Sequence, residues 1–386
     1  MNDAPLKVFI IAGEVSGDNL GGALLSGLSD LKTLEVQGIG GDAILAAGLD
    51  KSLFPMDELS IMGIAEVLPK IPHMLKRIKQ TVLAIEAFNP DVVLSIDAPD
   101  FCFRVQKLLR KRGVVSPKQI HYGAPTVWAW RAGRAKKISK FLDGIICLFP
   151  FEPPYFEAHG LKAVAAGHPV VESGALEADG VKGRGDIPLK YNQVIGLLLG
   201  SRGGELKYTA PALCETVKIL QAKYPDLQVQ VPTLPRLEAR VKAILDAHGI
   251  KNVHIHTDKT KKWDVFASCQ VALAVSGTVG LELCMTKTPH IIAYRTSALT
   301  YQILRHIIKT PFAHLGNIIL NRALIPEFIQ NECQLQEMAQ VADALLCDDQ
   351  LVNDMRSGFF EIAKAVGAGA KDTPAQIAAR FVTETN

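Results

Sequence analysis

Carboxylates and small turn residues follow several of the apolar, strand-like runs of this 386-residue chain. Asp97 comes directly after the apolar run 92–96 and opens the stretch DAPDF. Proline suits the first position of a helix, so Pro99 predicts a helix start with Ala98 as its N-cap residue. Asp97 is then not used for capping, whereas Asp100 falls in the first turn, where the helix dipole favours a carboxylate. We therefore predict Asp97 as a general base and Asp100 as a structural residue.

The stretch GEVSGD, residues 13–18, lies between an apolar run and a helix that we expect over 19–30. Glycine-rich turns between a strand and a helix often bind phosphates. This one has no P-loop lysine and lacks the G-x-G-x-x-G spacing of dinucleotide sites. A different role is therefore indicated, and one option is that Ser16 or Asp18 caps the following helix.

A comparable turn, SGTVGLE at 276–282, follows the apolar run 271–275. Ser276, Gly277 and Thr278 would open a helix whose free N–H groups suit a diphosphate. Glu282 is the only charge in this apolar helix, and a capping box would need a glutamate where Leu281 stands. We expect Glu282 to pair with a ligand group such as the hydroxyls of a ribose.

Arg202 lies in a companion turn, GSRGGE at 200–205. Its guanidinium could bind a diphosphate through two charge-assisted hydrogen bonds. It could equally be a solvated surface side chain. The SGT turn in the same half of the chain favours the diphosphate role.

Two further features leave alternatives open. His121 ends an apolar run and is either a base or anion contact, or a satisfied histidine at a strand end. The tryptophans of PTVWAWR are followed by a run of basic residues from Arg131 to Lys140, which is either a solvated helix face or a surface for phosphates or lipid headgroups.

The segment 61–75 is apolar, is interrupted by Pro69 and Pro72, and is bordered by basic residues. This pattern is typical of an interfacial element that touches lipid, although a helix pair that packs on its own domain would look similar. We expect the prolines to break the helix. The candidate lipid-contacting residues are Ile64, Val67, Leu68, Ile71, Met74 and Leu75.

Apolar runs alternate with helical stretches along nearly the whole chain, which predicts parallel sheets covered by helices. The length and the 48% hydrophobic content fit two packed domains, and a net charge of +3 gives no reason to expect nucleic acid. Seven scattered cysteines without metal-ligand spacing indicate neither disulfides nor a zinc site, as in a reducing cytosol. We expect no signal peptide and no spanning helix, hence a protein that is soluble or sits on a membrane surface.

We expect a first Rossmann-like domain over 1–171, a polar, glycine-rich linker over 172–192, and a second Rossmann-like domain over 193–340. The segment 341–386 should be helical, with a return of its last helix to the first domain as one option. Two such domains would face each other across a cleft, with ligands beyond the carboxyl ends of the strands.

Eight stretches, in order, resemble the lipid-A-disaccharide synthases: GEVSGD, IMGIAEVLPKI, DAPDF, PTVWAWR, LFPFE, GHP, GSRGGE and SGTVGLE. The resemblance extends from about Ile10 to Asn317, most of the chain. It implies an inverting glycosyltransferase of the GT-B fold that needs neither metal nor cofactor. The substrates it implies are UDP-2,3-diacylglucosamine and 2,3-diacylglucosamine 1-phosphate, which would be joined through a β-1,6 bond with release of UDP. This is a step of lipid A synthesis at the cytoplasmic face of the anionic inner membrane of Gram-negative bacteria.

The resemblance also implies roles for residues. Asp97 matches the essential aspartate of the family, and Arg202 and the SGT turn with Glu282 match its nucleotide site. Asn317 matches a sugar-binding asparagine, although Gly316 stands where the family usually has proline. With the diphosphate held by the second domain, the small residues of GEVSGD would admit a sugar closely, and Glu14, Ser16 and Asp18 would bind its hydroxyls.

Two other function classes are open at this point. One is a different GT-B enzyme that acts on a UDP-sugar, such as the peptidoglycan glucosaminyltransferase or a UDP-sugar epimerase, neither of which needs an acyl-binding segment like 61–75. The other is a non-catalytic nucleotide-binding or NAD-binding protein, against which the missing G-x-G-x-x-G argues.

Overall fold

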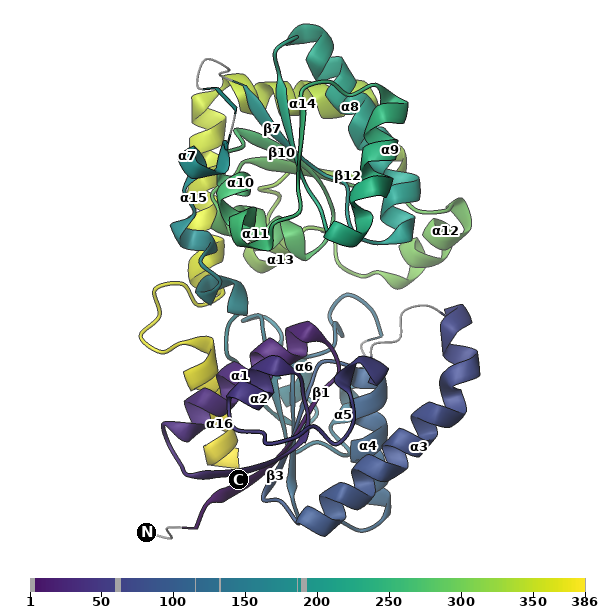
Figure 1. The fold of residues 1–386 in the computed structure, drawn as a ribbon, viewed down its shortest axis with the longest axis vertical. Coiled ribbons are helices and arrows are strands. Elements are labelled where there is room, and N and C mark those ends of the chain that lie inside the picture. Colours follow the sequence, from purple (N-terminus) through teal and green to yellow (C-terminus); the bar gives the residue numbers. More distant parts are fainter. Residues whose placement is uncertain are drawn as a thin grey trace. The chain divides into compact units, whose positions relative to one another are not determined.

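The computed structural model describes residues 4–385 apart from 60–63, 115, 132, 186 and 189–192, and for 64–71 it describes the backbone alone. The chain forms two compact units. Unit 1 comprises residues 1–169 and 369–386, and unit 2 comprises residues 170–368. Each is a parallel six-stranded sheet flanked by helices (Figure 1). This confirms the expected GT-B type of α/β fold.

The sheet of unit 1 has the strand order β2-β1-β3-β4-β5-β6, and all of its neighbouring strands are parallel. Its strands are β1 (Leu6–Ala12), β2 (Leu34–Ile39), β3 (Val92–Ile96), β4 (Lys118–Tyr122), β5 (Gly144–Cys147) and β6 (Lys162–Ala165). Its helices are α1 (Val15–Ser29), α2 (Asp42–Ala46), the 3-10 turn Met56–Leu59, α3 (Ile64–Phe88), α4 (Pro99–Lys111), α5 (Gly133–Ile138), α6 (Pro153–Glu157) and α16 (Pro374–Thr385).

The sheet of unit 2 has the order β12-β11-β10-β7-β8-β9 and is also parallel. Its strands are β7 (Val194–Leu198), β8 (Gln228–Pro232), β9 (Val253–His256), β10 (Val271–Val275), β11 (His290–Tyr294) and β12 (Glu327–Ile329). Its α-helices are α7 (Gly180–Gly183), α8 (Ala210–Lys223), α9 (Glu238–His248), α10 (Lys262–Ala267), α11 (Thr278–Met285), α12 (Ala298–Ile307), α13 (Leu315–Leu320), α14 (Leu335–Cys347) and α15 (Asp349–Ala365). Short 3-10 turns cover Pro169–Glu172, Ala175–Glu177, Pro235–Leu237, Lys259–Lys261 and Gln330–Glu332, and Glu205–Thr209 is a π-helical turn.

Both sheets reverse their strand order at one point. In unit 1 the chain leaves β1 in one direction to β2 and in the other to β3. In unit 2 the corresponding point lies between β7 and β10. Ligands of open α/β sheets bind outside the carboxyl ends of the strands at such switch points. All four turns singled out in the sequence, after β1, β3, β7 and β10, lie there.

The stretch 172–192 was expected to be a linker, and its described part is instead packed structure of unit 2. Gly183 lies so close to α10 that a Cβ atom would be 1.7 Å from the carbonyl oxygen of Asp264. The amide of Asp179 donates to the Asp264 carboxylate at 2.7 Å. Glycine here permits close packing of backbone rather than chain flexibility. Residues 186 and 189–192 lie outside the described residues.

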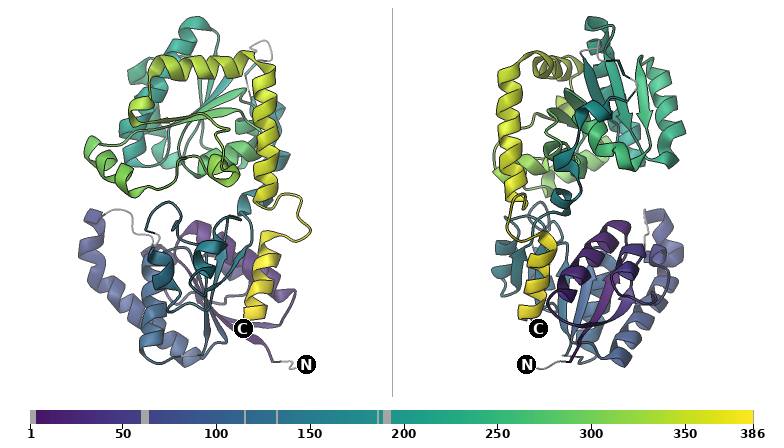
Figure 2. Two further views of the ribbon diagram at one scale, coloured as in Figure 1. Left: turned by 180° about the vertical axis from the view of Figure 1, so that it is seen from behind. Right: turned by 60° about the vertical axis from the view of Figure 1, so that its left-hand side comes forward.

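The C-terminal helices divide between the two units. In unit 2, α14 lies over β10 and β11 while α15 packs against α11 (Figure 2). In unit 1, α16 packs against α1 (Figure 1), where a Cβ on Gly27 would be 3.1 Å from the carbonyl oxygen of Ala375.

Helix α3 differs from the expectation that prolines would break it, because it runs through both Pro69 and Pro72. Each proline removes a backbone hydrogen bond and crowds the carbonyl of the preceding turn, at a cost of about 3 kcal/mol, yet the helix continues through both. Within the described part of the chain, no helix combines the length and the apolar character needed to cross a membrane.

Candidate active site

The turn from β3 to α4 has an uncommon backbone. Asp97 and Ala98 both adopt left-handed conformations, with φ of 49° and 40°. Such values are rare outside glycine and occur most readily for Asp and Asn. The amide of Asp97 donates to the carbonyl of Tyr122 at 3.0 Å. Helix α4 then begins at Pro99 with Ala98 as its N-cap, as predicted, so Asp97 takes no part in capping.

Three glycines make room for this turn. A Cβ on Gly13 would lie 2.5 Å from the Cβ of Ala98, and one on Gly17 would lie 3.3 Å from the carbonyl oxygen of Ile96. Gly123, with φ of +91°, would place a Cβ 2.6 Å from Oδ1 of Asp97. The glycines of GEVSGD therefore let the β1–α1 turn approach the end of β3. The expectation that these small residues also admit a sugar stays a prediction.

Helix α1 starts at Val15, earlier than predicted, so Glu14 is its N-cap residue and Ser16 lies in its first turn. The Ser16 hydroxyl donates to Oδ2 of Asp97 at 3.2 Å. Burial raises the pKa of Asp97, the hydrogen bond from Ser16 opposes this, and the charge of Glu14 raises the pKa further. The structure thus places Ser16 and Glu14 beside the carboxylate of Asp97, whose proton affinity is increased.

Asp18 is not available to a ligand, in contrast to the sequence prediction. Its side chain is 4% exposed, and its carboxylate accepts hydrogen bonds from the amides of Gly41 at 2.7 Å, Ala43 at 2.9 Å and Ile44 at 3.2 Å. These amides open α2, so Asp18 caps a helix other than its own. Its partners come from more than 20 residues away, and the local pattern could not reveal them.

His121 belongs to the core of unit 1 and is not a base. It is fully buried, its Nδ1 lies 2.7 Å from Oγ of Ser95, and its ring packs edge-on against Phe103. Burial lowers the pKa of His121 to about 3, so the imidazole is neutral at physiological pH. Of the two alternatives left open by the sequence, this is the structural one, except that the buried Nε2 has no hydrogen-bond partner among the described residues.

In unit 2, the turn after β7 is closed by Glu205, which the sequence analysis did not single out. Its Oε2 accepts from the amides of Ser201 at 2.8 Å and Arg202 at 3.0 Å. Glu205 begins a π-helical turn, a feature frequent at functional sites. A glutamate four residues after a serine in a glycine-rich turn was the available signal. The Arg202 side chain is 79% exposed, with Nη1 3.4 Å from Oε1 of Glu205.

The turn after β10 opens α11 with Gly277 as N-cap and without a side-chain cap. The Ser276 hydroxyl donates to the carbonyl of Ala313 at 3.1 Å, and Thr278 is the first helical residue. Glu282 was expected to pair with a ligand group, and the structure gives its carboxylate a protein partner. It forms an ion pair with Nζ of Lys262 at 2.7 Å, so its charge is balanced within unit 2.

Asn317 is fully buried and its amide is fully used. It donates to the Ile325 carbonyl at 2.8 Å and to Glu327 at 2.7 Å, and accepts from the amides of Leu324 and Ile325, both at 2.9 Å. The sugar-binding role predicted for Asn317 is therefore replaced by a structural one, which holds the segment after α13. These partners follow it by seven to ten residues, without a recognisable motif.

One group of potential metal ligands occurs among the described residues, formed by the buried Cys284, His290 and His314. Nδ1 of His314 accepts from the amide of Gly316, so we assign its proton to Nε2, which lies 2.9 Å from Nε2 of His290. Nδ1 of His290 donates to the Thr288 carbonyl at 2.8 Å. Burial lowers the pKa of both histidines. The pair is a closed, neutral chain of hydrogen bonds.

The predicted lipid-contacting residues are only partly within view. The side chains of Ile64, Val67, Leu68 and Ile71 lie outside the described residues. Met74 packs against the core of unit 1, whereas Leu75 is 53% exposed.

The sequence analysis missed a second exposed apolar row, on α12 of unit 2. Leu299, Ile303 and Ile307 are spaced four residues apart, and Leu299 is 74% exposed. The helical spacing of these residues in ALTYQILRHI was the signal that could have revealed the row.

Comparisons with known proteins agree over nearly the whole chain. The family described as lipid-A-disaccharide synthetase matches residues 8–381. A lipid-A-disaccharide synthase of Rhodospirillum centenum is 44% identical over 368 residues, which cover 95% of this chain and 91% of that protein. One from Paramagnetospirillum magneticum is 38% identical and covers 98% and 97%.

Two solved structures share the fold at low sequence identity. The UDP-GlcNAc 2-epimerase of Neisseria meningitidis, bound to UDP-GlcNAc, aligns with a TM-score of 0.62 at 13% identity and covers 98% of this chain and 99% of its own. MurG of Acinetobacter baumannii aligns with a TM-score of 0.57 at 11% identity and covers 98% and 100%.

The reassignment of Asp18 can be tested by Asp18→Ala. Removal of a buried carboxylate leaves three helix amides unpaired, and hydrogen bonds to charged groups contribute about 1.5–3 kcal/mol each. We expect a clearly lower melting temperature in calorimetry. Asp42→Ala, which removes an exposed carboxylate from the first turn of the same helix, is the control and should have little effect. An unchanged melting temperature with weakened substrate binding would instead return Asp18 to the ligand site.

Proposed function

Because the chain belongs to the lipid-A-disaccharide synthase family, and is therefore a glycosyltransferase of lipid A biosynthesis that acts on lipid A precursors, we propose the following reaction. The enzyme joins UDP-2,3-diacylglucosamine to 2,3-diacylglucosamine 1-phosphate through a β-1,6 bond and releases UDP. The observation that carries this proposal is the Asp97 carboxylate, which lies at the switch point of unit 1 with a raised pKa. Incubation with both substrates and detection of the disaccharide by mass spectrometry tests it.

In the proposed mechanism, the 6-hydroxyl of the acceptor attacks the anomeric carbon of the donor. Asp97 removes the hydroxyl proton as the new carbon–oxygen bond forms. The bond from the anomeric carbon to the diphosphate breaks at the same time, and UDP leaves with the electron pair. A single displacement inverts the anomeric centre, which turns an α-linked donor into a β-linked product. Ser16 donates a hydrogen bond to Asp97 and orients its carboxylate. Glu14 lies close enough to raise the pKa of Asp97, and we propose that it also binds a sugar hydroxyl.

We assign the nucleotide to the switch point of unit 2. Arg202 is exposed and its charge is only weakly engaged by Glu205, at 3.4 Å, so its guanidinium can bind a diphosphate. Ser276, Gly277 and Thr278 open α11, whose N-terminal amides suit an anion. Support for a UDP-sugar donor comes from the UDP-GlcNAc 2-epimerase of Neisseria meningitidis, which has a similar fold and was solved bound to UDP-GlcNAc.

We also propose that the enzyme works at the anionic surface of the cytoplasmic face of the inner membrane, where its acylated substrates reside. The exposed Leu75 of α3 supports this, as does the apolar row of α12. Arg305 and Lys309, at the end of and just after α12, are exposed cations suited to anionic headgroups.

Asp97→Asn should fold normally, bind UDP and lose most of its turnover. Asn tolerates the left-handed backbone at this position. A general base contributes about 10²–10⁴-fold, so kcat should fall by that factor. Because burial raises the pKa of Asp97, the acidic limb of kcat/KM in the wild type should lie above pH 3.8, the ordinary value of the group. Near-normal turnover of the variant would exclude Asp97 as the base.

The same variant has a second, independent readout in stability. A carboxyl whose pKa is raised on folding favours the folded state at low pH, and this contribution disappears as the pH rises through the folded pKa. At neutral pH the ionised Asp97 thus lowers stability, and Asp97→Asn should melt no lower than the wild type. The difference should shrink towards acidic pH.

Arg202→Ala should weaken UDP binding in calorimetry. The loss of a charge-assisted contact costs about 1.5–3 kcal/mol, which corresponds to about a 10- to 150-fold weaker affinity. The exposed side chain implies an unchanged melting temperature. Lys242→Ala removes a cation from an exposed position of α9 and is the control.

Glu282 needs a paired comparison in that experiment, because its carboxylate contacts Lys262. Binding to ribose predicts that Glu282→Gln weakens UDP binding more than Lys262→Gln does. Equal affinities for both variants and the wild type would leave Glu282 with the ion pair alone.

Vesicle binding distinguishes lipid contact from core packing at two adjacent residues. Leu75→Ser should weaken binding to anionic vesicles without a change in melting temperature, since burial of a leucine side chain contributes about 1.5–3 kcal/mol. Met74→Ser should lower the melting temperature, because Met74 packs on the core.

The double variant Leu299→Ser, Ile303→Ser should also weaken vesicle binding. High salt should reduce wild-type binding. Unchanged vesicle binding in both exposed-residue variants would refute these contacts.

A further inference from the structure

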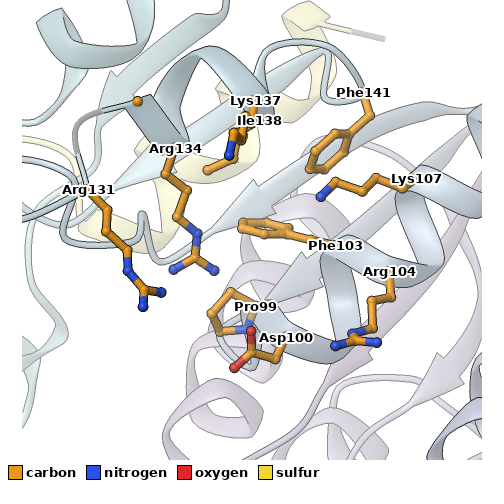
Figure 3. Close-up of a pocket in the computed structure, with 11 residues that line it drawn as sticks. Pro99, Asp100, Phe103, Arg104, Lys107, Arg131, Arg134, Lys137, Ile138 and Phe141 are labelled. Atoms are coloured by element: carbon orange, nitrogen blue, oxygen red, sulfur yellow. The ribbon is translucent and has the colours of Figure 1, made fainter.

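The proposed reaction leaves a cationic cavity of unit 1 without a role. This cavity has a volume of about 670 Å³ and lies beside α4 and α5 (Figure 3). Five cationic side chains line it, and they come from both elements and from the turn before α5: Arg104, Lys107, Arg131, Arg134 and Lys137. Asp100 is its only lining carboxylate among the described residues.

Ion pairs among the described residues do not engage these five cations. Within the described part of the chain, ion pairs form at other cations of the same region, such as Arg110 with Asp143 and Arg112 with Glu86, but at none of these five. The aromatic rings nearby bind cations through their faces instead, with Arg134 5.4 Å from the Phe103 ring and Lys107 5.1 Å from the Phe141 ring. The cavity lining therefore combines aromatic rings with a surplus of positively charged hydrogen-bond donors, as an anion site requires.

The cavity also lies close to the proposed base. Its lining begins at Pro99, two residues after Asp97. Consecutive Cα atoms are about 3.8 Å apart, so the Cα atoms of Pro99 and Asp97 are within about 7.6 Å of each other. Figure 3 shows Pro99 and Asp100 at the same cavity as the guanidinium of Arg134 and the ring of Phe103. An anion bound there would be a neighbour of the reacting hydroxyl.

We propose that this cavity binds the phosphate monoester of the acceptor sugar, an inference that rests on the proposed function. The anomeric position and the 6-hydroxyl are at opposite ends of a hexose. A phosphate anchored between α4 and α5 would thus direct the far end of the sugar back towards Asp97. A dianionic phosphate accepts several charge-assisted hydrogen bonds, for which arginine and lysine are the suited donors. In this way the cationic cavity would select a phosphorylated acceptor and fix its orientation.

The test compares two acceptors in neutral detergent micelles, which contain no anionic lipid. One is 2,3-diacylglucosamine 1-phosphate and the other is the same sugar without phosphate. The variant is Lys107→Gln combined with Lys137→Gln, both exposed and thus compatible with folding. We expect its KM for the phosphorylated acceptor to rise by about tenfold or more, equivalent to about 1.4 kcal/mol. The KM for the unphosphorylated acceptor should stay at the wild-type value.

The matched control is Lys111→Gln combined with Lys136→Gln. It makes the same charge change on the same two helices, at exposed positions outside the cavity lining. It should leave both KM values unchanged. An equal loss for both acceptors, or no loss for either, would overturn the phosphate assignment while disaccharide formation by the wild type upholds the proposed reaction.

A second arm separates the acceptor phosphate from the phosphodiesters of lipid headgroups. If the cavity variant loses binding to anionic vesicles but keeps its KM for the phosphorylated acceptor in micelles, the cavity is a headgroup site and the proposal is wrong. If the wild type forms no disaccharide from the phosphorylated acceptor, the proposed reaction fails, and the assignment fails with it.

Discussion

The candidate site of unit 1 depends on the close approach of the β1–α1 turn to the carboxyl end of β3. Two consecutive non-glycine residues, Asp97 and Ala98, adopt left-handed conformations there. Each costs on the order of 1–3 kcal/mol unless the surroundings compensate. The surroundings permit this turn through Gly13, Gly17 and Gly123, where a Cβ atom would lie 2.5 Å from Ala98, 3.3 Å from Ile96 and 2.6 Å from the Asp97 carboxylate. Packing thus holds the Asp97 carboxylate in a position that local backbone preference would not choose.

The acidic residues around this turn have separate tasks because they differ in burial. Asp18 is buried, and its carboxylate accepts hydrogen bonds from the amides at the start of α2. These bonds fix the turn that follows β2. Asp97 has no such amide partners, and burial raises its pKa. Glu14 stays exposed at the start of α1. The three carboxylates therefore differ in role: Asp18 caps a helix, Asp97 has an increased proton affinity, and Glu14 is exposed to solvent.

The sequence was sufficient for features that depend on local chemistry. Apolar runs predicted the parallel strands, and Pro99 predicted both the start of α4 and the freedom of Asp97 from capping. It was insufficient where a polar side chain finds distant partners. Asp18, Asn317 and Glu282 all looked free for a ligand, yet their partners Gly41, Ile325 and Lys262 follow or precede them without a fixed spacing. The glycines of 172–185 wrongly indicated a linker for a related reason. Glycine is the residue that both a flexible chain and closely packed backbone require.

The two switch points complement each other in charge. Asp97 and the turns that we propose for the nucleotide belong to different units. In unit 2, Glu205 is engaged by the amides of its own turn while Arg202 stays exposed, which supports the proposed binding of an anion there. On the proposed assignment the acceptor phosphate binds near Asp97, and the lining cations of α4 and α5, which form no ion pair within the described residues, would neutralise its charge.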